Sequence, residues 1–192
     1  MPAGRIVVAL GRPPQSRCWR SMRERDFLNV LEALAHSGVR YVVVGGTAVV
    51  LHGHLRVTAD LDLVVALDPP NVLAAIGALE SLGFKPQIPV RAQEFADPQT
   101  RRKWIEDKGM TVFSMWTPFV RGFTVDLFVK EPIPFEELYE RADRFVVGST
   151  EVAVASIPDL IALKRKAGRP IDIEDIRVLE AVELTRSQGE RP

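Results

Sequence analysis

Two aspartates, Asp60 and Asp62, lie two residues apart in the apolar stretch DLDLVVA. Side chains at this spacing on a β-strand point to the same face, about 6 to 7 Å apart. Two carboxylates so close together raise the pKa of one of them unless a positive charge intervenes. A divalent cation relieves this repulsion, and Mg²⁺ is the usual ion where phosphates also bind. The pair therefore predicts a Mg²⁺ site, with Mn²⁺ as the alternative ion; a solvated strand face or a turn partner is the other interpretation.

A third aspartate, Asp126, lies inside another apolar run, FTVDLFV. A buried charge without a partner is costly, so this carboxylate needs a cation or hydrogen-bond donors. The ion held by Asp60 and Asp62 would supply that partner. The alternative is an aspartate of the core that pairs with an arginine or caps a backbone amide.

A glycine pair, Gly45 and Gly46, follows the apolar run YVVV at residues 41–44. The run predicts a buried strand, and the glycines allow a sharp turn into a short helix from Thr47 to about His54. Amides at such a turn, together with the helix dipole, favour anions. We therefore expect Gly45, Gly46 and Thr47 to bind a triphosphate, unless the glycines serve the turn alone. His52 and His54 are two apart and cannot easily share a metal on a helix, so a capping or packing role is expected for them.

Composition limits the class of protein. The chain has 192 residues, 25 of them Lys or Arg and 25 Asp or Glu, so its net charge gives no footprint of a nucleic-acid binder. Cys18 is the single cysteine, which excludes an internal disulfide and a cysteine-based zinc site. No apolar run approaches the roughly 18 to 20 residues that span a bilayer, so we expect no membrane segment and a cytoplasmic location.

The elements that must position these residues follow from periodicity and from glycine and proline signals. Residues 1–20 predict a flexible arm, residues 21–156 a core that carries the three acids, and residues 157–192 a helical element packed on that core. Within them we expect helices at 23–37, 71–82, 98–108, 135–142 and, after Pro158, two more separated by Gly168 to Pro170. We expect strands at 41–44, 60–66, 84–90, 110–116, 123–130, 145–147 and 152–155.

Two groups of basic residues are candidate phosphate contacts. Lys164, Lys166 and Arg169 lie on the C-terminal helices, where a solvent-facing role is the alternative. A second group surrounds Trp104, for which a solvated helix face with one anchoring tryptophan is the preferred interpretation over a substrate-facing patch; it comprises Arg101, Arg102, Lys103 and Lys108.

Taken together, these motifs resemble the nucleotidyltransferase superfamily that includes DNA polymerase beta, and in particular its bacterial minimal and abortive-infection toxin-like branch. The matching pieces are Gly45 to Ala48, Leu51 to Gly53, Arg56, Thr58, Asp60 to Leu63, Asp159 to Ile161, Lys164, Ala167 to Pro170, Asp172 and Asp175. Many members carry serine directly after the first glycine, whereas Gly46 stands there in this chain.

The resemblance implies an α/β (α+β) fold: a mixed twisted sheet flanked by helices, with C-terminal helices. It implies that Asp60, Asp62 and Asp126 are catalytic and hold Mg²⁺, and that Lys164 and Arg169 bind the nucleotide with the glycine turn. The implied reaction transfers NMP from an NTP, such as ATP, to a hydroxyl of tRNA, of a partner protein or of a small molecule. A toxin-antitoxin or phage-defence role, with a cognate toxin or antitoxin protein as partner, belongs to the same resemblance.

Two other functions compete with this one. The first is a catalytically silent, antitoxin-like module that binds a nucleotide or a partner protein; loss of an acid would favour it, and all three acids are present. The second is a metal-dependent phosphohydrolase, which the absence of a His-Asp cluster disfavours.

Overall fold

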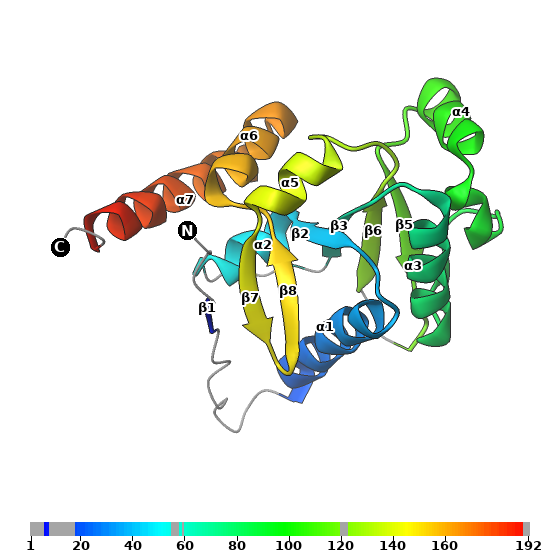
Figure 1. Ribbon diagram of the computed structural model, residues 1–192, viewed down its shortest axis with the longest axis horizontal. Helices are drawn as coiled ribbons and strands as arrows, with labels where there is room; N and C mark the ends of the chain where they lie inside the picture. Colours follow the sequence, from blue (N-terminus) through cyan, green and yellow to red (C-terminus); the bar gives the residue numbers. More distant parts are fainter. Residues whose placement is uncertain (1–5, 8–17, 55–57, 59, 120–122, 190–192) are drawn as a thin grey trace.

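The computed structural model describes residues 6–7, 18–54, 58, 60–119 and 123–189 (Figure 1). Its strands are β1 (Ile6–Val7), β2 (Tyr41–Val44), β3 (Asp60–Val65), β4 (Lys85–Pro86), β5 (Val112–Trp116), β6 (Thr124–Phe128), β7 (Asp143–Val147) and β8 (Thr150–Val154). They form one sheet in the order β1-β7-β8-β2-β3-β6-β5-β4. Parallel and antiparallel pairs both occur, so the predicted mixed sheet is confirmed.

The helices lie before, between and after these strands. They are α1 (Cys18–His36), α2 (Gly45–Leu51), α3 (Pro69–Ser81), the 3-10 helix η1 (Ala92–Ala96), α4 (Pro98–Lys108), α5 (Phe135–Arg141), α6 (Ile157–Ala167) and α7 (Pro170–Gly189). Helices α1 and α3 contact each other, whereas α7 packs along α6 and extends away from the rest of the molecule (Figure 1). Within the described residues, none of the helices combines the length and the hydropathy needed for a bilayer span.

The adjacent strands β3, β6 and β5 each have two different faces. Their buried positions are apolar and join α1 and α3 in the core: Leu61, Leu63, Val125, Leu127, Phe113 and Met115. Because side chains alternate along a strand, the positions between them all point to the opposite face. That second face carries the acids and is only partly buried.

Helices α3 and α4 begin within two residues of their predicted starts, and an aspartate caps each of them. Asp68 caps α3 by accepting the amide of Asn71, and Asp97 caps α4 through two amides of its first turn. The predicted strand at 84–90 shrinks to the two residues of β4. In α4, Arg101 is buried and donates to the carbonyl oxygens of Phe95 and Leu67, so it supports the fold and does not face a substrate.

The N-terminal region differs from the predicted arm at two places. Strand β1 pairs in parallel with β7, and α1 begins at Cys18 instead of near residue 23. The prediction of a flexible arm is therefore wrong for residues 6–7 and 18–20. Residues 6–7 form a strand because the edge of β7 offers backbone groups with which they can make hydrogen bonds. The rest of the predicted arm, residues 1–5 and 8–17, lies outside the described residues.

Candidate active site

The pairing of β3 with β6 brings the predicted acids together. Asp62 lies directly opposite Asp126 in this parallel pair, and Asp60 lies opposite Thr124. The three carboxylates therefore share one face of the sheet, as expected from the spacing of Asp60 and Asp62. Oδ1 of Asp60 accepts a hydrogen bond of 2.7 Å from Oγ1 of Thr124. On the next strand Ser114 faces Asp126 and donates a hydrogen bond to its carboxylate.

The glycine pair, Gly45 and Gly46, lies against the carboxylate of Asp62. Gly45 has a φ of +63°, which favours glycine, and a Cβ on this residue would collide with the Asp62 carboxylate. The backbone N–H of Gly46 donates to the same carboxylate. Helix α2 begins at Gly45, two residues earlier than predicted, so the glycines are its first residues and do not form a separate turn.

Thr47 points away from the acids' open face. It is buried, and its hydroxyl donates a hydrogen bond of 3.1 Å to the carbonyl oxygen of Asp60. This contact links the first turn of α2 to the start of β3. Arg56, part of the motif that carries the resemblance, lies outside the described residues.

Burial and mutual repulsion perturb the acids. Burial, and then the charges of Asp126 and Asp60, raise the pKa of Asp62 to about 6, although Gly46 and Arg169 act in the opposite direction. The pKa of Asp126 is also raised, chiefly by burial. Among the described residues, Oδ1 of Asp126 has no hydrogen-bond partner. The site thus holds excess negative charge, which is unusual for a protein interior and typical of functional sites.

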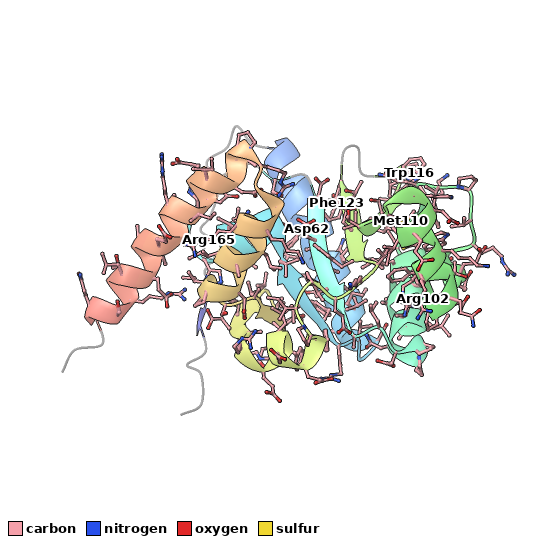
Figure 2. All side chains as sticks on the ribbon, turned by 90° about the horizontal axis from the view of Figure 1, so that it is seen from above. Asp62, Arg102, Met110, Trp116, Phe123 and Arg165 are labelled. Carbon is pink, nitrogen blue, oxygen red and sulfur yellow. The ribbon has the colours of Figure 1, made fainter. Side chains whose placement is uncertain are left out.

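A cavity of about 540 Å³ opens over Asp62 and Asp126. It brings together five of the predicted site residues, Gly45, Asp62, Asp126, Lys164 and Arg169, whereas Asp60, Gly46 and Thr47 do not line it. Viewed from above, Asp62 lies near the middle of the molecule, with Arg165 of α6 on one side and Met110 on the other (Figure 2).

Lys164 is buried and already neutralised. Its Nζ is 3.2 Å from Asp172 and 2.6 Å from Asp175, two carboxylates that are each 1% exposed. Burial would raise the pKa of Asp172, but hydrogen bonds from Arg169 and Lys164 outweigh it and lower the pKa to about 2. A lysine with two anionic partners has little charge left for a phosphate, so this side chain primarily joins α6 to α7.

Arg169 is the more available cation. Its side chain is 64% exposed, and its backbone N–H, Nε and Nη2 donate to Asp172. Asp172 thereby holds the arginine at the junction of α6 and α7, beside the cavity that Asp62 enters. Asp172 is the third residue of α7, and its carboxylate accepts the backbone N–H of Arg169, which directly precedes the helix.

Whether a divalent ion fits can be judged from the donors. Within the described part of the chain, no group of three or more His, Cys, Asp or Glu side chains is arranged as a finished metal site. The donor set is nevertheless suitable, because carboxylate oxygens are the ligands that Mg²⁺ prefers. A cation would offset the repulsion that contributes to the raised pKa of Asp62, and it would give a partner to Oδ1 of Asp126, which has none among the described residues.

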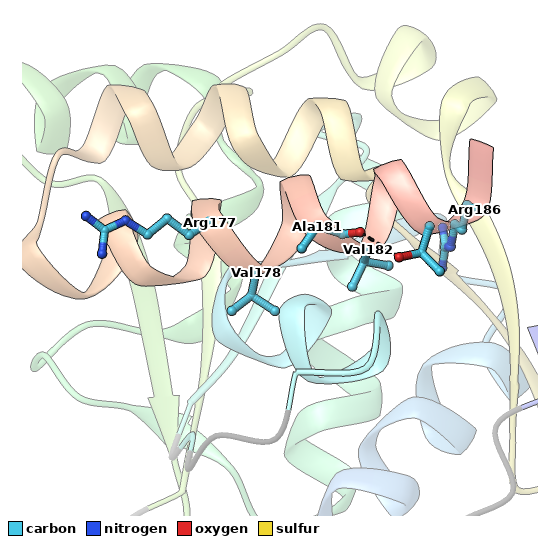
Figure 3. Close-up of a pocket in the computed structure, with 6 residues that line it drawn as sticks. Arg177, Val178, Ala181, Val182 and Arg186 are labelled. Carbon is cyan, nitrogen blue, oxygen red and sulfur yellow. Dashed lines mark hydrogen bonds between the residues drawn. The ribbon is translucent and has the colours of Figure 1, made fainter. Parts of the chain in front are cut away.

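A second cavity, of about 520 Å³, lies along α7 away from the acids (Figure 3). Its lining consists of Arg177, Val178, Ala181, Val182, Thr185 and Arg186. Arg186 also reaches the buried His52, whose Nε2 lies 2.9 Å from the carbonyl oxygen of Ala155. His52 follows the last residue of α2 and packs edge-on against Phe145, so its predicted capping or packing role is confirmed.

Sequence reasoning missed Ser114 and Thr124, the two hydroxyl groups that orient the acids. Both alternate with buried apolar residues, but only the strand register reveals which carboxylate each one meets. Asp172 and Asp175 belonged to a recognised motif, yet their pairing with Lys164 depends on how α7 packs along α6.

Comparison with known proteins adds independent information. A family model described as "Nucleotidyltransferase of unknown function (DUF6036)" matches residues 26–185. A search of curated proteins finds no match.

Solved structures with a similar fold include a lincosamide antibiotic adenylyltransferase and the antibiotic-resistance factor ANT(2")-Ia. The lincosamide antibiotic adenylyltransferase LnuA with bound lincomycin is 15% identical, covers 83% of this chain and 97% of its own, and has a TM-score of 0.56. ANT(2")-Ia in complex with adenylyl-2"-tobramycin is 16% identical over 87% and 96%, with a TM-score of 0.54. An antigenic nucleotidyltransferase-like protein from Paracoccidioides brasiliensis is 18% identical over 83% and 76%, with a TM-score of 0.53. These likenesses concern the fold.

Proposed function

Because this chain belongs to the DUF6036 family of nucleotidyltransferases of unknown function, we propose that it transfers a nucleoside monophosphate from an NTP to a hydroxyl group of an acceptor. The observation that supports this most strongly is the direct opposition of Asp62 and Asp126 across β3 and β6, at a cavity that Arg169 also lines. Nucleotidyl transfer brings the negative charge of a triphosphate to a site of carboxylates, so it requires cations between the two.

Asp60, Asp62 and Asp126 would hold Mg²⁺, or Mn²⁺ in its place. A bound ion of this kind neutralises charge on the triphosphate and lowers the pKa of the attacking hydroxyl. The protein's own contribution is to fix the carboxylates: Thr124 orients Asp60, the amide of Gly46 orients Asp62, and Ser114 orients Asp126.

In the proposed reaction the acceptor oxygen attacks the α-phosphorus of the NTP, the bond to the β-phosphate breaks, and pyrophosphate leaves. Asp126 accepts the proton of the hydroxyl, because its carboxylate lines the cavity and its Oδ1 has no hydrogen-bond partner among the described residues. Arg169 contacts the leaving pyrophosphate, with Gly45 and Gly46 at the start of α2 as further contacts. Lys164 contributes indirectly, through the Asp172 carboxylate that holds Arg169.

The test incubates the protein with each α-phosphate-labelled NTP, Mg²⁺ and a bacterial lysate. Wild-type protein should label an acceptor and release pyrophosphate, whereas Asp62→Ala and Asp126→Ala should each abolish both. Asp107→Ala, which removes an exposed carboxylate on α4, is the matched control and should behave as wild type. Transfer at the wild-type rate by either site variant would refute the assignment.

The same labelling experiment shows which class of molecule is the acceptor. Label in the tRNA, in a protein or in the small-molecule fraction identifies the class of acceptor, and competition among unlabelled NTPs shows whether ATP is the donor. A toxin or phage-defence role would be a use of the same reaction in the cell. Its test is growth arrest on expression of wild-type protein but not of Asp62→Ala, relieved by a cognate partner protein.

The second candidate is a catalytically silent module that binds a nucleotide or a partner. The observation in its favour is that the described acids are not arranged as a finished metal site. Calorimetry and pyrophosphate release separate the two functions, because a silent module takes up NTP with Mg²⁺ yet releases no pyrophosphate with any acceptor fraction.

A further inference from the structure

The cavity over the acids continues into a region with apolar walls. We define the apolar lobe by the residues Ile105, Met110, Val112 and Phe128, which come from α4, the segment between α4 and β5, β5 itself and β6. Phe128 follows Asp126 by two residues on the same face of β6, so the lobe begins immediately beside the acids. The whole cavity of about 540 Å³ is of the size that binds small molecules in proteins.

The charged residues around the apolar lobe affect which acceptors can bind there. Among the described residues that line the cavity, Glu131 is the one acid besides Asp62 and Asp126. Glu131 is engaged, because it accepts the amide of Phe135 at the start of α5. The exposed Lys130 and Lys166 also line the cavity. Apart from the two acids of the site, a polycationic acceptor would therefore find only a carboxylate that already accepts a backbone amide, whereas an anionic group of an acceptor can pair with Lys130 or Lys166.

The strand order indicates which substrate occupies the lobe. Gly45 follows β2, and the sheet then continues through β3 with Asp62, β6 with Asp126 and β5 with Val112. If the triphosphate tail lies near Gly45 and Arg169, the leaving pyrophosphate departs on the β2 side of the acids. Attacking and leaving oxygens lie roughly in line in phosphoryl transfer, so the acceptor must approach from the β6 and β5 side.

We propose that the apolar lobe is the acceptor subsite, and that the acceptor is a small, uncharged or anionic hydroxyl compound with an apolar body. This inference rests on the proposed nucleotidyl transfer and adds the chemical class of its second substrate. Apolar walls bind the body of the acceptor, and Asp126 at the mouth of the lobe receives its hydroxyl. Macromolecular acceptors and polycations such as aminoglycosides are excluded by it.

The first experiment fractionates the acceptor. A lysate is divided by ultrafiltration, and the filtrate is passed over a strong cation exchanger and a reversed-phase resin at neutral pH. Acceptor activity, measured as label transferred from α-labelled NTP, should pass the filter, flow through the cation exchanger and be retained by the reversed-phase resin. Activity retained by the filter or by the cation exchanger would overturn the proposal. No label in any fraction would contradict the nucleotidyl transfer itself, and the binding measurement below then tests the lobe alone.

The second experiment measures binding to the lobe without catalysis. The anionic, apolar fluorophore 8-anilinonaphthalene sulfonate is titrated into wild-type protein, Met110→Glu and Met110→Leu. The added carboxylate should weaken binding about tenfold or more, whereas the leucine variant should stay within about twofold of wild type. Leu184→Gln, on the exposed apolar surface of α7, controls for binding elsewhere and should have no effect. Equal binding by wild type and Met110→Glu would overturn the proposal.

Kinetics on the same variants separate the acceptor from the nucleobase. Met110→Glu should raise the KM for the fractionated acceptor about tenfold while the KM for NTP stays within about twofold. A rise in the KM for NTP alone would assign the lobe to the base of the nucleotide and overturn the proposal. The circular dichroism spectrum and unfolding midpoint of each variant confirm that the fold is intact.

Discussion

Replacing Asp62 with asparagine should abolish nucleotidyl transfer and yet stabilise the metal-free protein. The ionised carboxylate of Asp62 is half-buried beside Asp126 and Asp60, which together with burial raise its pKa from 3.8 to about 6. Asparagine has nearly the same shape, and its carbonyl oxygen can still accept the amide of Gly46. The variant therefore removes the charge while keeping the hydrogen bond.

The magnitude follows from linkage between protonation and folding. A carboxyl whose pKa is raised in the folded state binds protons more tightly there, so the folded protein loses stability as the pH rises from about 4 through about 6. A shift of about two units corresponds to about 3 kcal/mol at roughly 1.4 kcal/mol per unit. Because the side chain is partly exposed, solvent screening reduces this, and we expect a gain of about 1 to 2 kcal/mol in the variant near neutral pH.

Urea unfolding followed by tryptophan fluorescence, with EDTA present, measures the difference at several pH values. The advantage of Asp62→Asn should be near zero around pH 4, grow towards pH 6 and then stay constant, because only the wild-type side chain titrates. Asp107→Asn on the surface of α4 is the matched control and should show no such profile. Saturating Mg²⁺ should stabilise wild type and leave Asp62→Asn unchanged. A variant less stable than wild type near neutral pH, or a difference independent of pH, would refute the reasoning.

Three further predictions follow from the site. Gly45→Ala should cost about 2 kcal/mol of unfolding free energy, because φ is positive and the added Cβ displaces the carboxylate of β3; an urea titration measures the loss, and an unchanged midpoint would contradict it. Lys164→Met should cost about 3 to 5 kcal/mol, because it removes the buried ammonium group that neutralises Asp172 and Asp175, whereas Lys166→Met on the exposed side of the same helix should be nearly neutral in the same titration. Arg169→Ala should raise the KM for NTP about tenfold with little effect on the KM for acceptor. Arg165→Ala should change neither, because Arg165 is exposed on α6, pairs with Glu180 and does not line the cavity; equal kinetics for the two variants would remove Arg169 from the nucleotide site.

Much of the fold was predictable because local signals agreed with the final packing. Alternation correctly separated the buried face of β3, with Leu61 and Leu63, from the face that carries the acids. Proline at the start and glycine past the end placed α3 and α4 within one or two residues. The N-terminal strand could not be predicted, because its two residues are ordered by an edge of β7 that lies far along the chain.

The sequence allowed us to predict which acids come together in the candidate site, but not which basic residues remain available there. Asp62 and Asp126 stand out in sequence because each interrupts an apolar strand, and Asp60 stands out because it lies two residues before Asp62 at the start of β3. Lys164 carries the same formal charge whether it faces a phosphate or a carboxylate, and sequence spacing does not distinguish the two. Its burial among the acids of α7 depends on the packing of two helices, which is long-range information.

The two acidic clusters of this chain differ in how their charge is compensated. Asp172 is nearly fully buried but has Lys164 and Arg169 as partners, and its pKa falls to about 2, so the ionised form is stabilised within the protein itself. Asp62 and Asp126 meet hydrogen-bond donors but no side-chain ion pair among the described residues, and their pKa values rise. Positions that break local rules without compensation in the fold are where function is expected. The first cluster is therefore a structural junction, and the second is the site at which we propose that a cation and a phosphate bind.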